Sequence, residues 1–549
     1  MCGIFAVIQL VSSYNKRQHE TQFKELWMSG QSRGPENSSW LDHEVGYIGF
    51  HRLAINGLNT ISNQPLKKKD CILICNGEIY NYKELYKSLG IEQETNSDCE
   101  IIIDMYKKYG IEYTLQNLDG VFGFVLIDSE NNQTFVARDP FGVRPIYYNK
   151  SIDCLMISSE YKQVQSFCYN GCEYGQFPPG CYLSVLKDKD YITKYSGFIK
   201  YNNFQLRLSY NSYGTDERLI PYQDIYNNLF AAVKKRVENT DRPVACLLSG
   251  GLDSSLIACM VKRILPQNIE LETYSIGMPG GADFAHAKTV ADFIGSKHTE
   301  ILVDENDFFN AIPDVIKAIS SYDTTTVRAS VGNYLIGKYI SEHSDAKVIF
   351  NGDGSDELAG GYMYFHYCPD SQTFDFECKR LLSNIHHFDG LRSDRCISTH
   401  GLETRTPFLD RSFVNYYLSI PAHFRDHNKV GKIEKYLLRK SVELYGENLM
   451  PSSVLWRNKE AFSDGVSAND NSWHSIIQKR VGEMKDLDST KKYNYNHPDS
   501  LEKLYYRTVF DKFYPNSEKI IPYFWMPQFC NATDASAREL TIYKNKNIE

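Results

Sequence analysis

Short apolar runs and turn residues alternate through the first part of the chain. Helical runs lie between them. One begins at Ser97, where Ser97 and Glu100 match a capping box. Pro178-Pro179-Gly180 predicts a turn near the end of this part. The runs predict β-strands over Gly3–Val11, Ile72–Cys75, Phe122–Ile127, Thr134–Ala137 and Leu155–Ser158.

The pattern changes after a Tyr- and Asn-rich stretch, Tyr201–Tyr213, which has no clear period and predicts a linker. Strands and helices then alternate, which predicts a parallel, doubly wound sheet. The rest of the chain is mostly helical. The expected elements are helix Tyr222–Glu238, strand Val244–Leu248, helix Ser254–Ile264, strand Leu271–Gly277, helix Phe284–Ile294, and strands His298–Val303 and Lys347–Phe350.

The length of the chain, 549 residues, exceeds what one hydrophobic core usually supports, so two or more domains are expected. The change of pattern places one domain at residues 1–200 and a second at 214–549. The first is expected to be α+β and the second α/β with a helical C-terminal part.

Composition narrows the classes of ligand. Hydrophobic residues make up 42% and charged residues 23% of the chain, which is ordinary for a globular protein. The net charge of −8 provides no basic surface for nucleic acid or an anionic membrane, so small-molecule ligands are expected. No run approaches the roughly 20 apolar residues of a membrane span. The first residues lack the features of a signal peptide, so we expect a cytoplasmic protein.

Cys2 is the first candidate for chemistry. Removal of Met1 would leave it with a free α-amino group, whose usual pKa of about 7.7–8.0 leaves it partly unprotonated at neutral pH. That amine can take the thiol proton, and a thiolate beside its own base is an activated acyl-transfer nucleophile. Taken alone, a cysteine at position two favours no function.

Other residues of the first part fit an amino-acid substrate. An Asn side-chain amide followed by a backbone N–H, as in Asn76-Gly77, suits an oxyanion hole. Arg52 is a candidate clamp for an α-carboxylate, and Asp98 a candidate partner for an α-ammonium group. Each has a simpler interpretation alone: a turn, a surface charge, and a favourable charge at a helix start.

The run Ser249-Gly250-Gly251-Leu252-Asp253-Ser254-Ser255 lies between a predicted strand and helix. Its small residues allow backbone N–H groups to approach a phosphate, and the helix N-terminus adds partial positive charge. It lacks the G-x-x-x-x-G-K-[ST] pattern of a Walker A loop. Asp253 is a candidate Mg²⁺ ligand together with Asp356, which follows another predicted strand.

The first part resembles the glutaminase domain of class II amidotransferases. That resemblance implies a four-layer αββα sandwich of the N-terminal-nucleophile type. It further implies that Cys2 is the nucleophile, that Asn76 and Gly77 form the oxyanion hole, and that glutamine is bound by Arg52, Leu53, Ala54, Ile55, Asn56, Asn76, Gly77, Glu78 and Asp98. It rests on Cys2-Gly3-Ile4, Arg33-Gly34-Pro35, Asn76-Gly77-Glu78, Ser97–Glu100, Leu118-Asp119-Gly120 and Ala137–Gly142.

The second part is similar to the ATP pyrophosphatase domain of glutamine-hydrolysing asparagine synthetases. The resemblance implies that Lys459 meets phosphate charge, that Asp253 and Asp356 bind Mg²⁺, and that ATP is bound by Leu248, Ser249, Gly250, Gly251, Asp253, Ser254, Ile276, Asn351 and Gly352. It rests on the loop at 249–255 and on Tyr322–Ser330, Gly360-Gly361-Tyr362, Glu403–Asp410, Lys432–Lys435 and Trp456–Gly465.

One loop departs from that family, which normally reads Ser-Gly-Glu-Gly-Ser-Asp-Glu. This chain has Asn351 in place of the Ser and Asp353 in place of the first Glu. The family ties that Glu to acyl-adenylate formation, so Asp353 is a candidate catalytic residue. Its side chain is one methylene shorter, and poor placement of such a group costs on the order of 10²-fold in rate.

The resemblance implies an enzyme that hydrolyses glutamine at Cys2, activates aspartate with Mg·ATP as β-aspartyl-AMP, and lets ammonia displace AMP to give asparagine. A dry passage for ammonia and a homodimer are expected on the same ground. Two alternatives stay open: an amidotransferase of this fold that acts on a different carboxylate, and a catalytically weakened family member. Lactam-forming relatives lack the cysteine that this chain has at Cys2.

Overall fold

The computed structural model describes residues 1–11, 16–166, 172–187, 193–204, 220–431, 433–460, 465–467, 472–488, 492–537 and 540. The chain forms two compact units, and neither is a single stretch of chain. The first contains residues 1–203, 239–242 and 398–403; the second contains 204–238, 243–397 and 404–549. Most of the expected linker, 205–213, lies outside the described residues. Among the described helices, none is long and apolar enough to cross a membrane.

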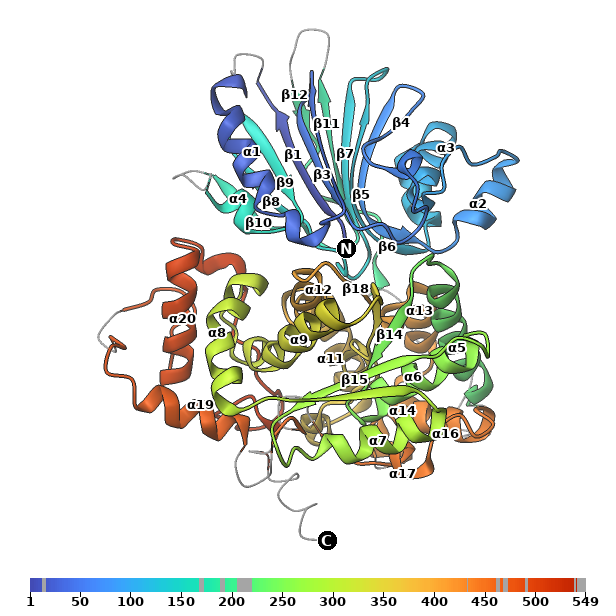
Figure 1. Ribbon diagram of the computed structural model, residues 1–549, viewed down its shortest axis with the longest axis vertical. Coiled ribbons are helices and arrows are strands. Elements are labelled where there is room, and N and C mark those ends of the chain that lie inside the picture. Colours follow the sequence, from blue (N-terminus) through green and yellow to red (C-terminus); the bar gives the residue numbers. More distant parts are fainter. Residues whose placement is uncertain are drawn as a thin grey trace. The chain divides into compact units, whose positions relative to one another are not determined.

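Two antiparallel sheets lie face to face in the first unit (Figure 1). One has the order β10 (Glu173–Gln176), β8 (Tyr147–Lys150), β9 (Cys154–Ser158), β1 (Gly3–Gln9), β3 (Gly46–Arg52), β2 (Asn37–His43). The other has the order β12 (Thr193–Tyr195), β11 (Cys181–Lys187), β7 (Gln133–Arg138), β6 (Gly120–Asp128), β5 (Cys71–Ile79), β4 (Leu66–Lys68), with β13 (Ile199–Lys200) also paired to β11.

Alternating apolar side chains explain the layers of this unit. One core joins residues of both sheets, such as Ile4 and Ile74, because alternate residues of the central strands point toward the other sheet. A second core joins Leu73 and Phe124 of the second sheet to Ile102 of α3. Helices α2 (Tyr82–Leu89) and α3 (Ile101–Asn117) cover that sheet, and α1 (Glu20–Met28) and α4 (Lys162–Gln165) cover the other (Figure 1). The predicted αββα sandwich is confirmed.

The capping box expected at Ser97 is wrong. Ser97 precedes a short 3-10 turn, Asp98–Glu100, and its side chain makes no capping hydrogen bond. The Glu100 carboxylate instead accepts from Lys68 Nζ (2.6 Å) and from the Thr95 hydroxyl (2.6 Å). A cation stabilises a buried carboxylate more than a helix-end N–H group does, so Glu100 pairs with Lys68 and does not cap the helix.

A parallel sheet forms the centre of the second unit, as predicted. Its order is β16 (Lys297–Leu302), β15 (Glu272–Gly277), β14 (Val244–Leu247), β17 (Val348–Phe350), β18 (Glu403–Arg405), with β14, β15, β16 and β17 in parallel register. Helices α6 (Leu252–Ile264), α7 (Asp283–Ile294) and α9 (Thr324–His343) pack on it, and α5 (Tyr222–Glu238) has the predicted bounds.

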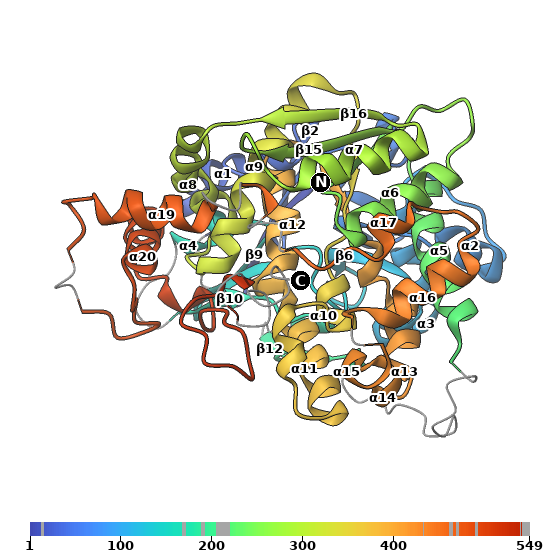
Figure 2. The same ribbon diagram turned by 90° about the horizontal axis from the view of Figure 1, so that it is seen from below.

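The remainder of the second unit is helical, also as predicted. Helices α19 and α20 lie side by side, and α20 packs on α8 (Figure 1; Figure 2). The helices outside the sheet layer are α8 (Glu305–Ile319), α10 (Ser355–Ala359), α11 (Ser371–Asn384), α12 (Asp389–Ser398), α13 (Arg411–Ser419), α14 (Ala422–Arg425), α15 (His427–Val430), α16 (Tyr436–Tyr445), α17 (Ser452–Leu455), α19 (Trp473–Gly482) and α20 (Leu501–Phe513).

A buried carboxylate, Asp410, ties α13 to α5. It caps α13 by accepting from Ser412 N–H (3.0 Å) and Phe413 N–H (3.1 Å). It also pairs with Arg236 (2.6 Å) and Lys235 (2.5 Å). Burial raises the pKa of Asp410, but the two cations outweigh burial and lower this pKa to about 2. The pair therefore stabilises the fold above the usual carboxyl pKa of about 3.9, and this contribution is lost as the pH falls toward 2.

We expect Asp410→Asn to destabilise the second unit by about 3 kcal/mol at neutral pH, because it removes the countercharge of the buried Arg236 and the half-buried Lys235. The apparent melting temperature at pH 7 and at pH 3 measures this effect, and the gap between variant and wild type should narrow at pH 3. Asp292→Asn, at an exposed pair with Lys288, is the control and should change little. A gap of the same size at both pH values would contradict the assigned ion pair.

Candidate functional site

Cys2 lies directly before β1, a central strand of the first sheet. Its Sγ donates to the Leu53 carbonyl oxygen (3.5 Å), at the point where β3 has just ended. Leu53, Ala54 and Ile55 are all buried there. The structure thus brings the predicted nucleophile to the start of the predicted glutamine-binding stretch, 52–56.

Met1 still occupies the position before Cys2. Its amino group is buried and donates to the Leu402 carbonyl oxygen (3.1 Å), and burial lowers the pKa of this amine to about 5. Burial raises the pKa of the Cys2 thiol. While Met1 is present the nitrogen of Cys2 is part of a peptide bond, so the base expected for the thiol exists only after Met1 is removed.

Asn76 has an unsatisfied donor. Its side chain is buried on β5, and among the described residues its Nδ2 has no hydrogen-bond partner. A buried N–H without a partner is costly, which makes it a ready donor to a negative oxygen. Gly77 follows, and a Cβ there would meet the Val121 carbonyl oxygen at 2.4 Å, so only glycine fits beside β6. These features suit the predicted oxyanion hole.

Arg52 and Asp98 are both buried and both held by the protein. The Arg52 guanidinium donates to the carbonyl oxygens of Asn59 (3.1 Å), Asn56 (3.3 Å) and Gly57 and to Asn63 Oδ1 (2.6 Å). All four acceptors are neutral, which suits a guanidinium that is to receive a carboxylate. Asp98 accepts from the Ile79 N–H (2.6 Å), which fixes one of its oxygens at the end of β5.

A later segment of the chain, 239–242, supports this site and was not anticipated from the sequence. The Glu78 carboxylate accepts from the side-chain amides of Asn56 and of Asn239 (3.2 Å). Asp241 accepts from Gly57 N–H (2.8 Å). No local pattern marks 239–242, because its partners lie more than 150 positions earlier in the chain.

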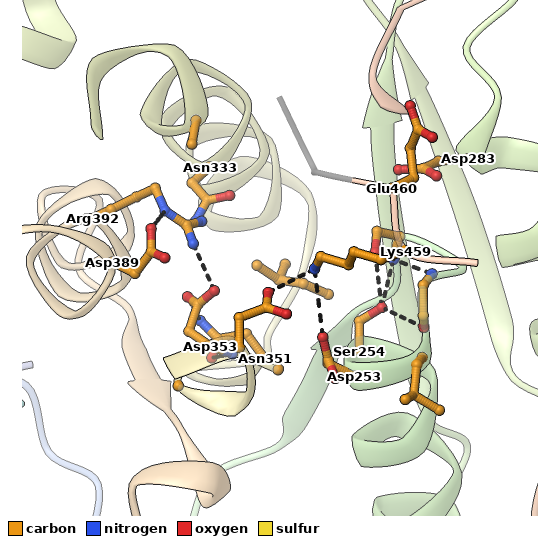
Figure 3. Close-up of a pocket in the computed structure, with 18 of the residues that line it drawn as sticks. Asp253, Ser254, Asp283, Asn333, Asn351, Asp353, Asp389, Arg392, Lys459 and Glu460 are labelled. Atoms are coloured by element: carbon orange, nitrogen blue, oxygen red, sulfur yellow. Dashed lines mark hydrogen bonds and ion pairs between the residues drawn. The ribbon is translucent and has the colours of Figure 1, made fainter. Parts of the chain in front are cut away.

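In the second unit, one pocket gathers the residues predicted to bind ATP, except Gly250, which does not line it. It lies at the carboxyl ends of the parallel strands, the usual ligand position in doubly wound sheets. Asp253, Ser254, Asn351, Asp353 and Lys459 converge there (Figure 3). The lining also includes Leu248, Ser249, Gly251, Ile276, Gly352 and Asp356.

The loop from Ser249 to Ser255 joins β14 to α6. Gly250 has φ +74° and a Cβ there would lie 2.4 Å from Ala287 N, so both the backbone and the packing require glycine. Gly251 begins α6 with no side-chain capping bond, which leaves helix-end N–H groups for a ligand. The Ser249 and Ser254 hydroxyls are 2.9 Å apart and close the loop.

Two carboxylates and two lysines form the charged centre of this pocket. Lys435 Nζ lies 2.5 Å from Asp253 Oδ2 and 2.6 Å from Asp356 Oδ1, and Lys459 Nζ lies 2.6 Å from Asp356 Oδ2. Burial raises the pKa of Asp356, but the two lysines outweigh burial and hold this pKa well below its usual range. Burial lowers the pKa of Lys459, but Asp356 and Asp253 raise it above its usual range. The Asp356 carboxylate is therefore ionised at neutral pH.

Lys435 was not anticipated from the sequence as a site residue, although Lys432–Lys435 supports the family resemblance. It sits before α16 in a left-handed conformation (φ 60°) and is almost fully buried. Its partner Asp253 is 182 positions earlier, which no local pattern reveals. Lys432 and residues 461–464 of the Trp456–Gly465 stretch lie outside the described residues.

The other end of the pocket holds an acidic cluster around Arg392. Its guanidinium binds Asp353 (2.8 Å) and Asp389 (3.1 Å) (Figure 3). Burial, together with the neighbouring Asp389, raises the pKa of Glu357 well above its usual range. A neutral Glu357 and the ionised Asp389 both bond the Tyr362 hydroxyl (2.8 and 2.6 Å). The Asn351 amide donates to Asp353 and to Ser393, and its predicted adenine contact stays a prediction.

Comparisons with known proteins agree with the two sites. A family described as glutamine amidotransferase domain matches residues 1–206, and one described as asparagine synthase matches residues 224–377 and 369–519. Together they define a glutamine amidotransferase whose second half is an asparagine synthase.

Among relatives, the chain is 42% identical to an asparagine synthetase [glutamine-hydrolyzing] of Homo sapiens, over 93% of this chain and 95% of that protein. It is 40% identical to the protein of that name from Gallus gallus, over 91% of each chain. This chain belongs to the glutamine-hydrolysing asparagine synthetase family. A solved amidotransferase from B. subtilis is 17% identical with a TM-score of 0.29, over 55% of this chain and 65% of that one, and adds nothing to this assignment.

Proposed function

We propose that this chain makes asparagine and glutamate from aspartate, glutamine, ATP and water, with release of AMP and pyrophosphate. The observation that carries the proposal is the cluster of Asp253, Asp356, Lys435 and Lys459 beside an uncapped helix start. An uncapped helix start and two lysines suit a triphosphate, and the two carboxylates suit its metal counterion. The family membership supports the same reaction.

At the glutamine site, we propose that the Cys2 thiolate attacks the side-chain amide carbon of glutamine once Met1 has been removed. The α-amine of Cys2 accepts the thiol proton and then delivers it to the departing ammonia. Asn76 Nδ2 and the Gly77 N–H stabilise the negative oxygen, while Arg52 and Asp98 hold the α-carboxylate and the α-ammonium group. Water then hydrolyses the thioester to glutamate and restores the thiol.

At the ATP site, an oxygen of the aspartate side chain attacks the α-phosphorus and pyrophosphate leaves. The N–H groups at the start of α6 and the Lys459 ammonium take up the negative charge of the departing pyrophosphate. Asp353 lies at the other end of the pocket, and we assign to it the role that the family gives this position, in formation of the acyl-adenylate. Ammonia then displaces AMP from the acyl carbon, which gives asparagine.

Mg²⁺ is the proposed metal. The residues fit it, because the Asp253 and Asp356 carboxylates lie close together: Lys435 Nζ bridges them, 2.5 Å from Asp253 Oδ2 and 2.6 Å from Asp356 Oδ1. Two neighbouring carboxylates beside a phosphate-binding loop are the donors that Mg²⁺ uses in nucleotide sites. When bound with ATP, the ion would neutralise phosphate charge and favour the loss of pyrophosphate.

A single incubation tests the proposed function. The purified protein is supplied with Mg·ATP, aspartate and glutamine, and pyrophosphate, asparagine and glutamate are measured together. Equal amounts of pyrophosphate and asparagine, both lost without aspartate, are expected. Glutamate alone would overturn the aspartate assignment. A screen of other carboxylates for pyrophosphate release would then identify a different acceptor, which is the second candidate function, or a weakened synthetase if none responds.

The cytoplasmic location and the homodimer are part of this proposal and rest on the family resemblance. Cell fractionation tests the first. Sedimentation of the purified protein tests the second, and a mass of one chain would contradict it.

A further inference from the structure

The loop Asn351–Gly354 follows β17 along a backbone path with little freedom. A Cβ on Gly352 would lie 2.7 Å from the backbone of Asp253, and Gly354 has φ +94° with Leu409 2.6 Å from a Cβ. The Asn351 N–H donates to the Arg405 carbonyl oxygen (3.1 Å) and ties the loop to β18. With the backbone held, the position of the Asp353 carboxylate depends on side chains.

The Asn351 side chain makes hydrogen bonds to both the side chain and the backbone of Asp353. Its Nδ2 uses both hydrogens, donating to Asp353 Oδ2 (2.9 Å) and to Ser393 Oγ (2.7 Å). Its Oδ1 accepts from the Asp353 N–H (3.3 Å). A serine at this position has one hydroxyl hydrogen and could not make all three bonds. The buried Asn351 amide is thus fully used, and two of its bonds go to Asp353.

Arg392 holds the other oxygen of the same carboxylate. Its guanidinium donates to Asp353 Oδ1 at 2.8 Å, and its Nε donates to Asp389 at 3.1 Å (Figure 3). The Asp353 carboxylate is therefore bound on two sides, by the Asn351 amide of its own loop and by the Arg392 guanidinium of α12. On α12, the charged or titratable groups that face it include Arg392, Asp389 and Cys396.

We propose that Asn351 is a positioning residue for Asp353, and that the lengths of these two side chains depend on each other. The short Asp353 side chain is held in its catalytic position because the long Asn351 side chain reaches it and donates a hydrogen bond. A longer carboxylate would collide with that amide, and a shorter residue at 351 would release the short carboxylate. This inference rests on the proposed function and identifies what places one of its catalytic groups.

A double-mutant cycle tests the dependence. Asn351→Ser, Asp353→Glu and the double variant are assayed for pyrophosphate and asparagine with an ammonium salt as nitrogen source, which bypasses Cys2. Each single change should lower kcat by about tenfold or more, because misplacement of a catalytic group by about 1 Å costs up to about 10²-fold. The double variant should regain at least about tenfold over the product of the two single losses.

The pH profile separates positioning from a general structural role. Loss of the Asn351 donor removes a bond to the ionised carboxylate and so raises the pKa of Asp353. The acidic limb of kcat/KM for aspartate should therefore move to higher pH in Asn351→Ser. The matched control is Asn228→Ser, since this exposed amide donates to the Asp224 carbonyl oxygen within α5, and its profile should match that of wild type.

Each outcome has one meaning. Single losses that simply multiply in the double variant, or an unmoved acidic limb in Asn351→Ser, would overturn the positioning role. A wild-type enzyme that releases no pyrophosphate with aspartate would overturn the proposed function itself. Melting temperatures of all variants within a few degrees of wild type confirm that folded proteins are compared.

Discussion

Cys2→Ala should abolish asparagine synthesis from glutamine and leave synthesis from ammonium salts within about twofold of wild type. The thiol is the group that forms the thioester, and removal of a covalent nucleophile costs at least about 10³-fold. Every residue that lines the ATP pocket belongs to the other unit, so aspartate activation keeps all its groups. Glutamate release and asparagine formation, each measured with both nitrogen sources, check this result.

The matched control is Cys530→Ala, a half-buried cysteine that lines neither site, and it should retain both activities. The intact mass of the wild-type protein must show that Met1 has been removed, since the buried methionine blocks the amine of Cys2. Loss of the ammonium-dependent reaction in folded Cys2→Ala protein would refute the assignment of two separate chemistries to two units.

Lys435→Met should lower the ATP-dependent reaction by at least about 10²-fold while glutamine hydrolysis without ATP continues. Its buried ammonium group balances two half-buried carboxylates, Asp253 and Asp356, and a poorly hydrated charge without its partner is strongly unfavourable. Because Lys435 helps to hold the pKa of Asp356 low, its loss raises that pKa. The carboxylate then binds a proton more readily and competes less well for a metal ion.

The activity of Lys435→Met should also depend on pH in a different way from that of wild type. Lowering the pH toward the usual carboxyl range protonates Asp356 earlier in the variant, so the activity of Lys435→Met should fall more steeply at acidic pH than that of wild type. Pyrophosphate release from about pH 5 to 8 measures the ratio. Lys234→Met, at an exposed pair on α5, is the control. A variant with normal ATP-dependent activity would remove Lys435 from the site.

The fold was predictable because its signals are local. The apolar run at Val244–Leu248 and the amphipathic period of Tyr222–Glu238 each carry their structure within a few residues, and α5 has the predicted bounds. The capping box at Ser97 failed because Glu100 has a distant partner, Lys68, which a local motif does not include.

Parts of the sites were not predictable for the same reason. The proposed residues Asp253 and Asp356 follow strands, where ligands of such sheets bind, and so could be expected from position. Lys435 reaches them through the tertiary fold alone. Likewise, in the sequence Asn351 and Asp353 are two separate departures from the family loop. Their hydrogen bonds in the structure show that the two residues interact.

The first unit is completed by two segments that come late in the chain, 239–242 and 398–403, and this has a consequence for protein synthesis. Its proposed glutamine-binding loop is braced by Asn239 and Asp241, and its buried Arg144 pairs with Glu403 (3.3 Å). All three partners leave the ribosome later than residue 203. At about 5–20 residues per second, the 200 or so residues from 203 to 403 take on the order of 10–40 s to make. A nascent glutaminase therefore stays incomplete until most of the synthetase has been translated. We therefore expect fragments that end before residue 403 to hydrolyse little glutamine.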